Sequence, residues 1–302
     1  MTADRNWPRA SDWLAGAHAP HPATRLTVLG VPLHLGSISE SRADLAPVAV
    51  REALSRYSTW DGEVHRNISV VAAEDLGDLD VAGLRPEEAM GPVTEAMGAA
   101  LGSADALCLL GGDNSVTRPG VHGLGTPLDR VGLLTLDAHF DLRDTGPGML
   151  NGNPVRALLE DGLPGDNVVQ VGIQPFANSS QYAEVAYEAG IRFVLAEEVR
   201  ARGVGGVVSE ALQRLDRRTD AIYVDLDVDV LDRAFAPATP GSRPGGLTPA
   251  DLRRAARLAG RHPKVRAVDL VEVDPTQDVA DATVLATAVT LLAFAAGLAS
   301  RR

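Results

Sequence analysis

The sequence predicts a single α/β domain in which helices cover both faces of a mainly parallel sheet. Short, uninterrupted runs of apolar and β-branched residues recur along all 302 residues, and segments with helical character separate most of them. Strands that are apolar throughout are typical of a parallel sheet buried on both faces. A strand-to-strand spacing of roughly 25 to 45 residues leaves room for right-handed crossover helices.

The expected strands and helices alternate along the chain. Apolar runs predict strands at 25–31, 68–73, 106–110, 131–136, 168–172, 192–195, 221–226 and 265–271. Helices are expected at 47–57, 86–101, 179–189, 205–215, 249–259 and 279–300. Residues 284–299 are rich in Ala and Thr, which indicates a buried helix rather than a membrane span. We expect one domain over residues 1–302, with a loosely ordered lead at 1–23.

Composition and charge narrow the classes of partner. The chain has 28 basic and 40 acidic side chains, which gives a formal net charge of −12. A surface of that sign repels phosphate backbones and anionic lipid, so we expect no nucleic-acid partner and no membrane partner. The single cysteine, Cys108, excludes an internal disulfide. Because the N-terminus also lacks a signal-peptide profile, we expect a cytoplasmic location.

Acidic side chains and one histidine follow several predicted strands, at the strand ends where parallel sheets bind ligands. They are Asp137, His139 and Asp141 after the strand at 131–136, and Asp225, Asp227 and Asp229 at the end of the strand at 221–226. Alternate residues of an extended chain point to one side, so each set can face one point. Two further strands end in polar residues, at 111–115 and 272–275.

A divalent cation explains such carboxylate clusters, because unpaired buried carboxylates repel one another. Oxygen ligands with one imidazole suit Mn²⁺, and two aspartate pairs on different strands could hold two ions. Any one Asp could instead be a helix cap or a turn residue. Three clusters after apolar strands favour the metal site. The chain has neither a phosphate-binding loop of the Walker type nor a Gly-x-Ser-x-Gly nucleophile motif.

At these strand ends the sequence resembles the ureohydrolase family of arginases, agmatinases and formimidoylglutamases. The shared segments are Gly-Gly-Asp-Asn-Ser at 111–115, Asp-Ala-His-Phe-Asp at 137–141, Asp-Val-Asp-Val-Leu-Asp at 227–232 and Glu-Val-Asp-Pro at 272–275. The resemblance implies a three-layer αβα fold around a mainly parallel, eight-stranded sheet. It also implies a binuclear Mn²⁺ site and hydrolysis of a C–N bond in an amidine or guanidine.

The resemblance also implies roles for individual residues. Asp137 and Asp227 would each bridge both ions, and Asp141 with Asn114 would complete one of them. His139 and Asp229 would complete the other ion. Asp141 would also hydrogen-bond the bridging hydroxide, and Glu272 would hold the cationic amidinium of the substrate.

Two positions depart from the family pattern. Asn114 stands where the family usually has a metal-binding His, and a neutral amide oxygen is a poorer ligand for Mn²⁺ than imidazole. We therefore expect the ion near Asn114 to bind more weakly. Asn151 lies in the loop where arginases and agmatinases place a catalytic His. Since Asn cannot carry a proton, Asp141 or water must protonate the leaving amine.

Within the family the chain looks most like the formimidoylglutamases, which cleave N-formimidoyl-L-glutamate to L-glutamate and formamide in histidine degradation. Metal-bridging hydroxide would attack the formimidoyl carbon of this small-molecule substrate. Its two carboxylates need local cations in a chain of net charge −12. Arg143 is the first candidate, with Arg156 and Arg243 next, and Asn151 and Asn153 could hydrogen-bond a carboxylate.

Two other hypotheses stay open. An agmatinase-like or guanidino-acid hydrolase that releases urea would have an acidic or neutral pocket for the substrate tail and would not depend on Arg143. A non-catalytic relative that binds a ligand or partner would explain Asn114 and Asn151. Family members commonly form trimers or hexamers, so the resemblance implies a homo-oligomer.

Overall fold

The central feature of the computed structural model, which describes residues 4, 6–17 and 24–301, is a sheet of eight parallel strands. Its strands are β1 (Thr24–Val31), β4 (Val71–Asp78), β5 (Ala106–Gly111), β6 (Val131–Leu136), β7 (Val168–Ile173), β8 (Arg192–Leu195), β9 (Ala221–Asp227) and β10 (Val265–Val271). A separate two-stranded hairpin joins β2 (Trp60–Asp61) to β3 (Arg66–Asn67). The eight-stranded parallel sheet expected from the sequence is confirmed.

The order of the strands across the sheet is β4-β1-β5-β10-β9-β6-β7-β8. The last two strands of the chain, β9 and β10, lie between β5 and β6 at the centre of the sheet. Every residue of β5, β6, β7 and β9 is buried, which explains why these strands are apolar without alternation. The carboxyl ends of four central strands therefore meet in one place.

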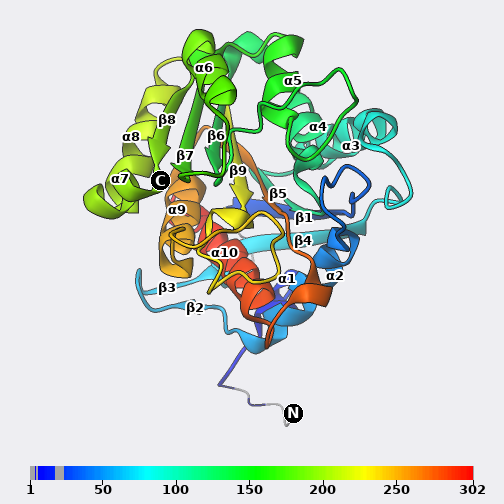
Figure 1. Cartoon of the computed structure of the whole chain (residues 1–302). Coiled ribbons are helices and arrows are strands. Elements are labelled where there is room, and N and C mark those ends of the chain that lie inside the picture. The colour runs from blue at the N-terminus through cyan, green and yellow to red at the C-terminus, as the bar shows by residue number, and fades with distance from the viewer. Residues whose placement is uncertain (1–3, 5, 18–23, 302) are drawn as a thin grey trace.

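Helices cover both faces of the sheet and complete the three layers (Figure 1). The helices are α1 (Ala10–Leu14), α2 (Ala46–Ala53), α3 (Pro86–Leu101), α4 (Thr117–His122), α5 (Pro154–Asp161), α6 (Ser180–Ala189), α7 (Ala196–Arg202), α8 (Val204–Asp216), α9 (Pro249–Arg261) and α10 (Ala282–Leu298). Two buried hydrophobic clusters fill the spaces between the layers. One contains residues of α1, α2 and α7–α10, and the other contains residues of α3–α6.

The C-terminal helix α10 is buried almost all round, as its Ala-rich and Thr-rich sequence predicts. Its first turn is held by Asp278, whose carboxylate accepts hydrogen bonds from the backbone amides of Thr283 and Val284. Neither α10 nor any other helix of the described chain combines the length and apolar character needed to cross a membrane.

Two regions differ from the expected elements. Residues 68–70 form a short 3-10 helix, and the strand β4 begins only at Val71. The lead at 1–23 was expected to be loosely ordered, yet residues 10–14 form α1 and Trp13 is fully buried, donating a hydrogen bond to the carbonyl of Val71. This part of the lead thus belongs to the core, while residues 1–3, 5 and 18–23 lie outside the described part of the chain.

Candidate metal centre

The predicted site residues follow four neighbouring strands at the centre of the sheet. Asn114 begins the short 3-10 helix after β5, and Glu272 follows β10 directly. Asp227 ends β9, and Asp137 follows β6. Because all four strands are parallel, their carboxyl ends bring these side chains to one edge of the sheet.

One part of the site consists of Asp137, His139 and Asp229, which we call the imidazole half. Their candidate ligand atoms all lie within 4.8 Å of one another. The His139 Nδ1 lies 2.9 Å from an Asp229 oxygen and 3.5 Å from an Asp137 oxygen. The second oxygen of Asp137, Oδ2, is buried and has no hydrogen-bond partner among the described residues. A buried carboxylate oxygen without a donor is suited to bind a cation.

The other part of the site is built around Asn114 and Asp141, which we call the amide half. The Asn114 Nδ2 donates a hydrogen bond of 2.6 Å to the Asp141 Oδ2. Both side chains are buried, and Asp141 has a positive φ of 53°. Such a backbone conformation is uncommon for a residue other than glycine. It persists where the surrounding structure fixes it, and such positions cluster at functional sites.

Asp227 lies in the same cleft as both halves. Its Oδ1 accepts a 2.8 Å hydrogen bond from the backbone amide of Asp229, which fixes the turn after β9. Asp225 lies within the strand, two residues before its carboxyl end. Of the three acidic residues of this run, only Asp227 and Asp229 therefore lie at the strand end.

Glu272 also has a positive φ, 68°, and its carboxylate is buried against the amide half. The Glu272 Oε1 accepts hydrogen bonds from the backbone amide of Asn114 at 2.7 Å and from the Asn151 Nδ2 at 3.0 Å. The Asn151 side chain is itself fixed, since its Oδ1 accepts from the backbone amide of Ile38 at 3.1 Å. Asn151 therefore holds Glu272 in position.

Burial and mutual repulsion raise the pKa values of most carboxyls in the site. Burial, followed by the charge of Asp229, raises the pKa of Asp137 to about 6. Burial and the nearby charge of Asp113 raise the pKa of Glu272 to about 8. The pKa of Asp141 lies well above its usual value for the same reasons, burial and the charge of Asp137. A cation placed among these buried carboxyls stabilises their ionised forms.

His139 and Asp229 are the exceptions. Burial alone would lower the pKa of His139, but the charge of Asp229 and the hydrogen bonds to Asp137 and Asp229 raise it to about 12. Burial alone would raise the pKa of Asp229, but the charge of His139 holds it below its usual value. In the metal-free protein His139 is thus an imidazolium that neutralises part of the site.

The site opens into a cleft of about 390 Å³. Its lining includes the buried carboxylates of Asp141, Asp227, Asp229 and Glu272, together with His139, the half-buried Asn151 and the exposed side chains of Arg143 and Arg243. Arg143 is exposed on this lining, and no ion pair or hydrogen bond joins its guanidinium to another side chain of the described residues. Arg243 donates through its Nη1 to the carbonyls of Pro240 and Gly241, which leaves its other nitrogens free to meet a ligand.

Two residues expected to bind substrate do not line this cleft. Arg156 forms an ion pair with Glu160 one turn further along α5, at 2.7 Å. Asn153 is fully buried and donates to the carbonyls of Asp144 and Gly148. In this structure Arg156 is therefore engaged within its own helix, and Asn153 shapes the loop before α5.

Three residues behind the amide half, Thr117, Asp269 and Tyr223, have no predicted role from the sequence. The Thr117 hydroxyl lies 2.7 Å from the Asn114 Oδ1 and 2.9 Å from the Asp269 Oδ2. The Tyr223 hydroxyl donates to the same Asp269 oxygen at 2.8 Å. In the sequence, Thr117 and Asp269 both lie close to the shared segments, but only the pairing of β5, β10 and β9 brings them together.

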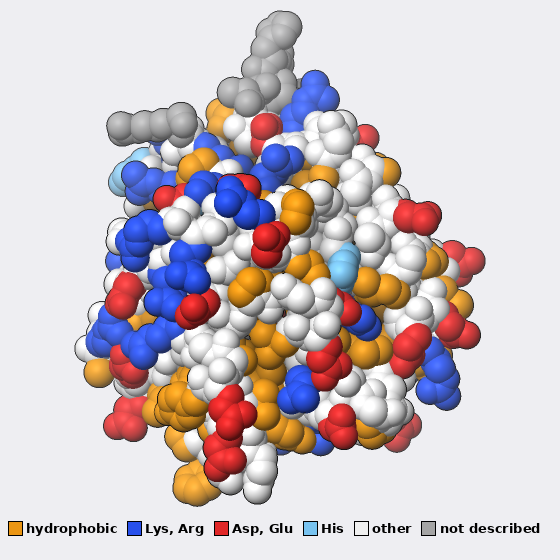
Figure 2. Space-filling model, turned by 90° about the horizontal axis from the view of Figure 1, so that it is seen from above, with side chains coloured by type: hydrophobic (Ala, Val, Ile, Leu, Met, Phe, Trp, Pro, Cys, Tyr) orange, Lys and Arg blue, Asp and Glu red, His pale blue; other side chains and the backbone are white. Residues whose placement is uncertain are grey.

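The surface seen in Figure 2 carries mixed charge. Basic side chains gather along the left of this view, on the side where α7, α8 and α9 lie in Figure 1, and acidic side chains are interspersed with them. Several are paired, such as Arg202 with Glu198 and with Glu210. Interspersed charge of this kind is typical of a solvated surface.

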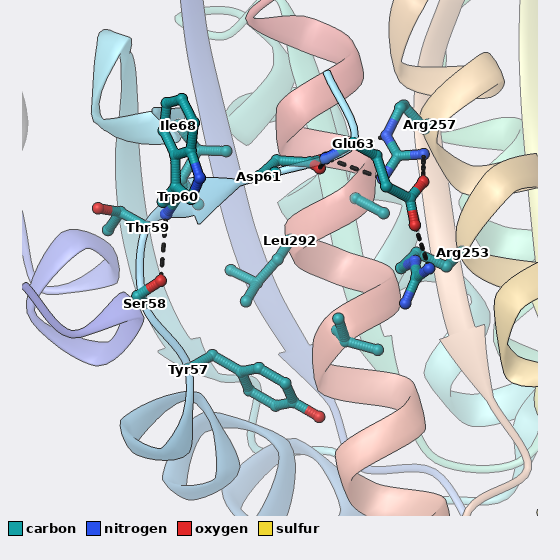
Figure 3. Close-up of a pocket in the computed structure, with 13 residues that line it drawn as sticks. Tyr57, Ser58, Thr59, Trp60, Asp61, Glu63, Ile68, Arg253, Arg257 and Leu292 are labelled. Carbon is teal, nitrogen blue, oxygen red and sulfur yellow. Dashed lines mark hydrogen bonds and ion pairs between the residues drawn. The ribbon is translucent and has the colours of Figure 1, made fainter. Parts of the chain in front are cut away.

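A second cavity, of about 330 Å³, shares no lining residue with the cleft (Figure 3). It lies between the segment from Tyr57 to Glu63 and the helices α9 and α10. Its charged side chains satisfy one another, since Arg257 pairs with Asp61 and with Glu63. This cavity holds no cluster of free catalytic or metal-ligating groups among the described residues.

Comparison with known proteins decides the family. The family model described as the Arginase family matches residues 24–296. The chain belongs to the arginase family. It is 36% identical over 281 residues to a formimidoylglutamase of Halalkalibacterium halodurans, an alignment that covers 89% of this chain and 86% of that protein.

Solved structures of this family superpose closely on the chain. The crystal structure of formimidoylglutamase from Bacillus subtilis gives a TM-score of 0.92 at 30% identity, covering 100% of this chain and 95% of the other. A Trypanosoma cruzi formiminoglutamase, solved with Mn²⁺, gives a TM-score of 0.87 at 23% identity, covering 98% and 100%. The three-layer arginase fold expected from the sequence is confirmed.

Proposed function

We propose that the chain hydrolyses N-formimidoyl-L-glutamate to L-glutamate and formamide with the help of two Mn²⁺ ions. The observation that carries the proposal is the convergence of Asn114, Glu272, Asp227 and Asp137 at four adjacent strand ends. It occurs in a member of the arginase family whose relatives include a formimidoylglutamase at 36% identity.

The two halves of the site fit two ions. Asp137, His139 and Asp229 would hold one ion, Asn114 and Asp141 the other, and Asp137 and Asp227 would be shared. Carboxylate oxygens with one imidazole and one amide suit Mn²⁺ better than a thiol-binding metal. When bound, such a pair of ions supplies a water of lowered pKa as nucleophile and polarises the substrate. The ion next to the neutral Asn114 would be the weaker of the two.

Glu272 would bind the amidinium group of the substrate. Its carboxylate is buried and already oriented by the Asn114 amide and by Asn151. Although its pKa is raised to about 8 in the free protein, a cationic amidinium beside it favours the ionised form. An ion pair of this kind discriminates amidines and guanidines from neutral amides.

Asp141 would carry the proton to the leaving nitrogen. Its carboxyl lines the cleft, and burial and the charge of Asp137 raise its pKa well above the usual value, which favours the protonated form. Asn151, in contrast, already uses its amide to orient Glu272 and has no titratable proton. Asp141 is therefore the general acid of the proposed reaction.

Arg143 and Arg243 would hold the two carboxylates of the glutamate part. Both line the outer part of the cleft, while the metal end is strongly acidic. In a chain of net charge −12, two local guanidinium groups are the groups on this cleft that can attract a dianionic tail. The tail of agmatine, which has no carboxylate, would gain nothing from them, and a guanidino acid with a single carboxylate would not need both.

The proposal is tested with Mn²⁺-loaded protein and a panel of substrates. Release of formamide and glutamate from N-formimidoyl-L-glutamate is expected, with no urea from agmatine, arginine or 4-guanidinobutyrate. Urea from one of these compounds would replace the formimidoylglutamase assignment by another activity of the family. No product from any substrate, with metal shown to be bound, would favour a non-catalytic binding protein.

We also propose that the chain forms a homo-oligomer, a trimer or hexamer by resemblance, and that it acts in the cytoplasm on a small-molecule substrate. Its one cysteine, Cys108, is buried and free, which fits a reducing compartment. Sedimentation analysis would measure the number of subunits directly, and a monomer at micromolar concentration would contradict the oligomer.

A further inference from the structure

The position of Thr117 raises a problem of proton count behind the metal centre. Its hydroxyl lies within hydrogen-bond distance of two acceptor atoms, the Asn114 Oδ1 at 2.7 Å and the Asp269 Oδ2 at 2.9 Å. A hydroxyl has one proton, so it can donate to only one of them. All three side chains are essentially excluded from water, and a buried acceptor without a donor is costly.

Asp269 has two hydrogen-bond donors besides Thr117. Its Oδ2 also accepts from the Tyr223 hydroxyl at 2.8 Å, and its Oδ1 accepts from the backbone amide of Leu226 at 3.2 Å. Asp269 is thus held as an acceptor by two further donors. In the orientation seen here the Thr117 proton can therefore satisfy the Asn114 Oδ1. The Thr117 oxygen then faces the Asp269 Oδ2 at 2.9 Å with no proton between them.

Turning the Asn114 amide over removes the conflict. The oxygen and nitrogen of an amide are nearly equal in size, so both orientations fit the same space. In the turned orientation the Nδ2 donates to the Thr117 hydroxyl, which in turn donates to Asp269. The Oδ1 then faces Asp141 and the metal centre, where the Nδ2 now donates to the Asp141 Oδ2 at 2.6 Å.

We infer that Thr117, held by Asp269, is a positioning residue that presents the Asn114 oxygen to the second metal ion. Without a cation, an amide oxygen against the Asp141 carboxylate is repulsive, and the Asn114 nitrogen faces Asp141 instead. With a cation between them, the Asn114 Oδ1 and the Asp141 carboxylate would both be ligands. Behind them, the Asn114 Nδ2 would donate to the Thr117 hydroxyl, and that hydroxyl would donate to Asp269. The two orientations are thus coupled to metal binding.

This inference rests on the two-ion site of the proposed function and explains how a neutral amide can serve there. Hydrogen-bond partners of metal ligands typically change metal affinity by about 10-fold to 100-fold when they are removed. Thr117→Val keeps the shape of the side chain and removes only the hydroxyl. We therefore expect this variant to bind the weaker Mn²⁺ ion at least about tenfold less tightly.

The test is a Mn²⁺ titration of metal-free protein, followed by the electron paramagnetic resonance signal of free Mn²⁺, which counts bound ions without measuring activity. Wild type, Thr117→Val, Thr117→Ala and Thr117→Ser are compared with Thr290→Val. Thr290 is a matched control, since it is also buried and its hydroxyl donates only to the Ala286 carbonyl of its own helix. Thr117→Ala provides a second hydroxyl-free variant if Thr117→Val does not fold.

The expected result is a loss confined to the second ion in Thr117→Val or Thr117→Ala, with affinities near wild type in Thr117→Ser and Thr290→Val. In an Asn114→Ala background, Thr117→Val should have no further effect, because there is no amide left to orient.

A folded Thr117→Val that binds both ions as tightly as wild type would overturn the role of Thr117 alone. An equal further loss in the Asn114→Ala background would also overturn it, since that indicates a general structural effect. Wild type that binds a single ion would overturn the two-ion site and the inference together.

Discussion

The two halves of the metal centre are built from different chemistry on the same scaffold. In the imidazole half, His139 pairs with Asp229 at 2.9 Å, so opposite charges hold the ligands together before metal arrives. In the amide half, neutral Asn114 donates to Asp141, and the charge of that carboxyl is opposed by burial. The difference is that the His139 imidazolium must release its proton before it can bind a metal ion, whereas the Asn114 amide has no proton to release.

Removing a shared ligand should abolish the difference between the halves. Asp137→Asn is expected to lower turnover by about a thousandfold or more, because loss of a metal ion removes several kcal/mol of transition-state stabilisation. Asn114→Ala should lose only the weaker ion and recover part of its turnover at millimolar Mn²⁺. Metal content after dialysis and steady-state rates check both. Equal metal loss in the two variants would contradict the distinction.

Glu272→Gln should lower the activity but raise the thermal stability of the metal-free protein at high pH. Turnover is expected to fall by about a hundredfold, a magnitude typical of losing one charge-stabilising group. The pKa of Glu272 is raised from its ordinary value to about 8, so ionisation destabilises the folded state as pH rises. The variant should therefore unfold at a higher temperature than wild type at pH 8 to 9, by on the order of several degrees, in metal-free protein.

That stability gain should vanish below pH 4.5, the ordinary pKa of the group, because Glu272 is then protonated in both the folded and the unfolded chain. Thermal unfolding of both proteins across this pH range is the measurement. A variant that is less stable than wild type at pH 9 would contradict the assignment of a repelled, buried carboxylate.

Arg143→Met should act on substrate binding rather than on the metal centre. We expect KM for N-formimidoyl-L-glutamate to rise about 10-fold to 100-fold with little change in kcat, because the tail carboxylate is held equally in ground and transition states. Arg156→Met is the matched control, since Arg156 pairs with Glu160 outside the cleft. A change in KM of similar size in both variants would argue against a specific role for Arg143.

Mn²⁺ affinity should rise with pH, and release of the His139 proton in the imidazole half should determine how steeply it rises. The pKa of His139 is raised to about 12, so the ring is protonated at neutral pH and must release that proton to bind a metal. Affinity for the tighter ion should increase about tenfold per pH unit between pH 6.5 and 8.5. Below about pH 6, where Asp137 also binds a proton, the slope should steepen. Calorimetric titrations in buffers of different ionisation enthalpy would count the protons, and a pH-independent affinity would contradict the ion pair.

The imidazole half could be predicted from the sequence because its ligands are local. Asp137 and His139 follow one apolar strand, and Asp229 follows another, so a periodicity of two and the rule of strand ends suffice.

Residues 68–70 were predicted as strand because they are apolar, but Asn67 caps a 3-10 turn there by accepting from the Ser69 amide. The strand after them, β4, lies at the edge of the sheet and carries exposed polar residues, so it has no apolar signature.

The amide half could not be derived in the same way. Asn114 meets Asp141 and Thr117 meets Asp269 only because β9 and β10 enter between β5 and β6, an order that no local pattern encodes. Sequence position alone also made Asn153 a candidate substrate ligand. Its partners are the backbone carbonyls of Asp144 and Gly148, which only the folded loop places beside it.

The most direct test of a two-ion centre with unequal halves is a stepwise Mn²⁺ titration of metal-free protein in which bound metal and formamide release are measured at each addition. The account predicts that the first equivalent binds tightly with little turnover, and that turnover rises as the second, weaker ion fills the site at Asn114 and Asp141. Full turnover at one equivalent of Mn²⁺ would contradict it.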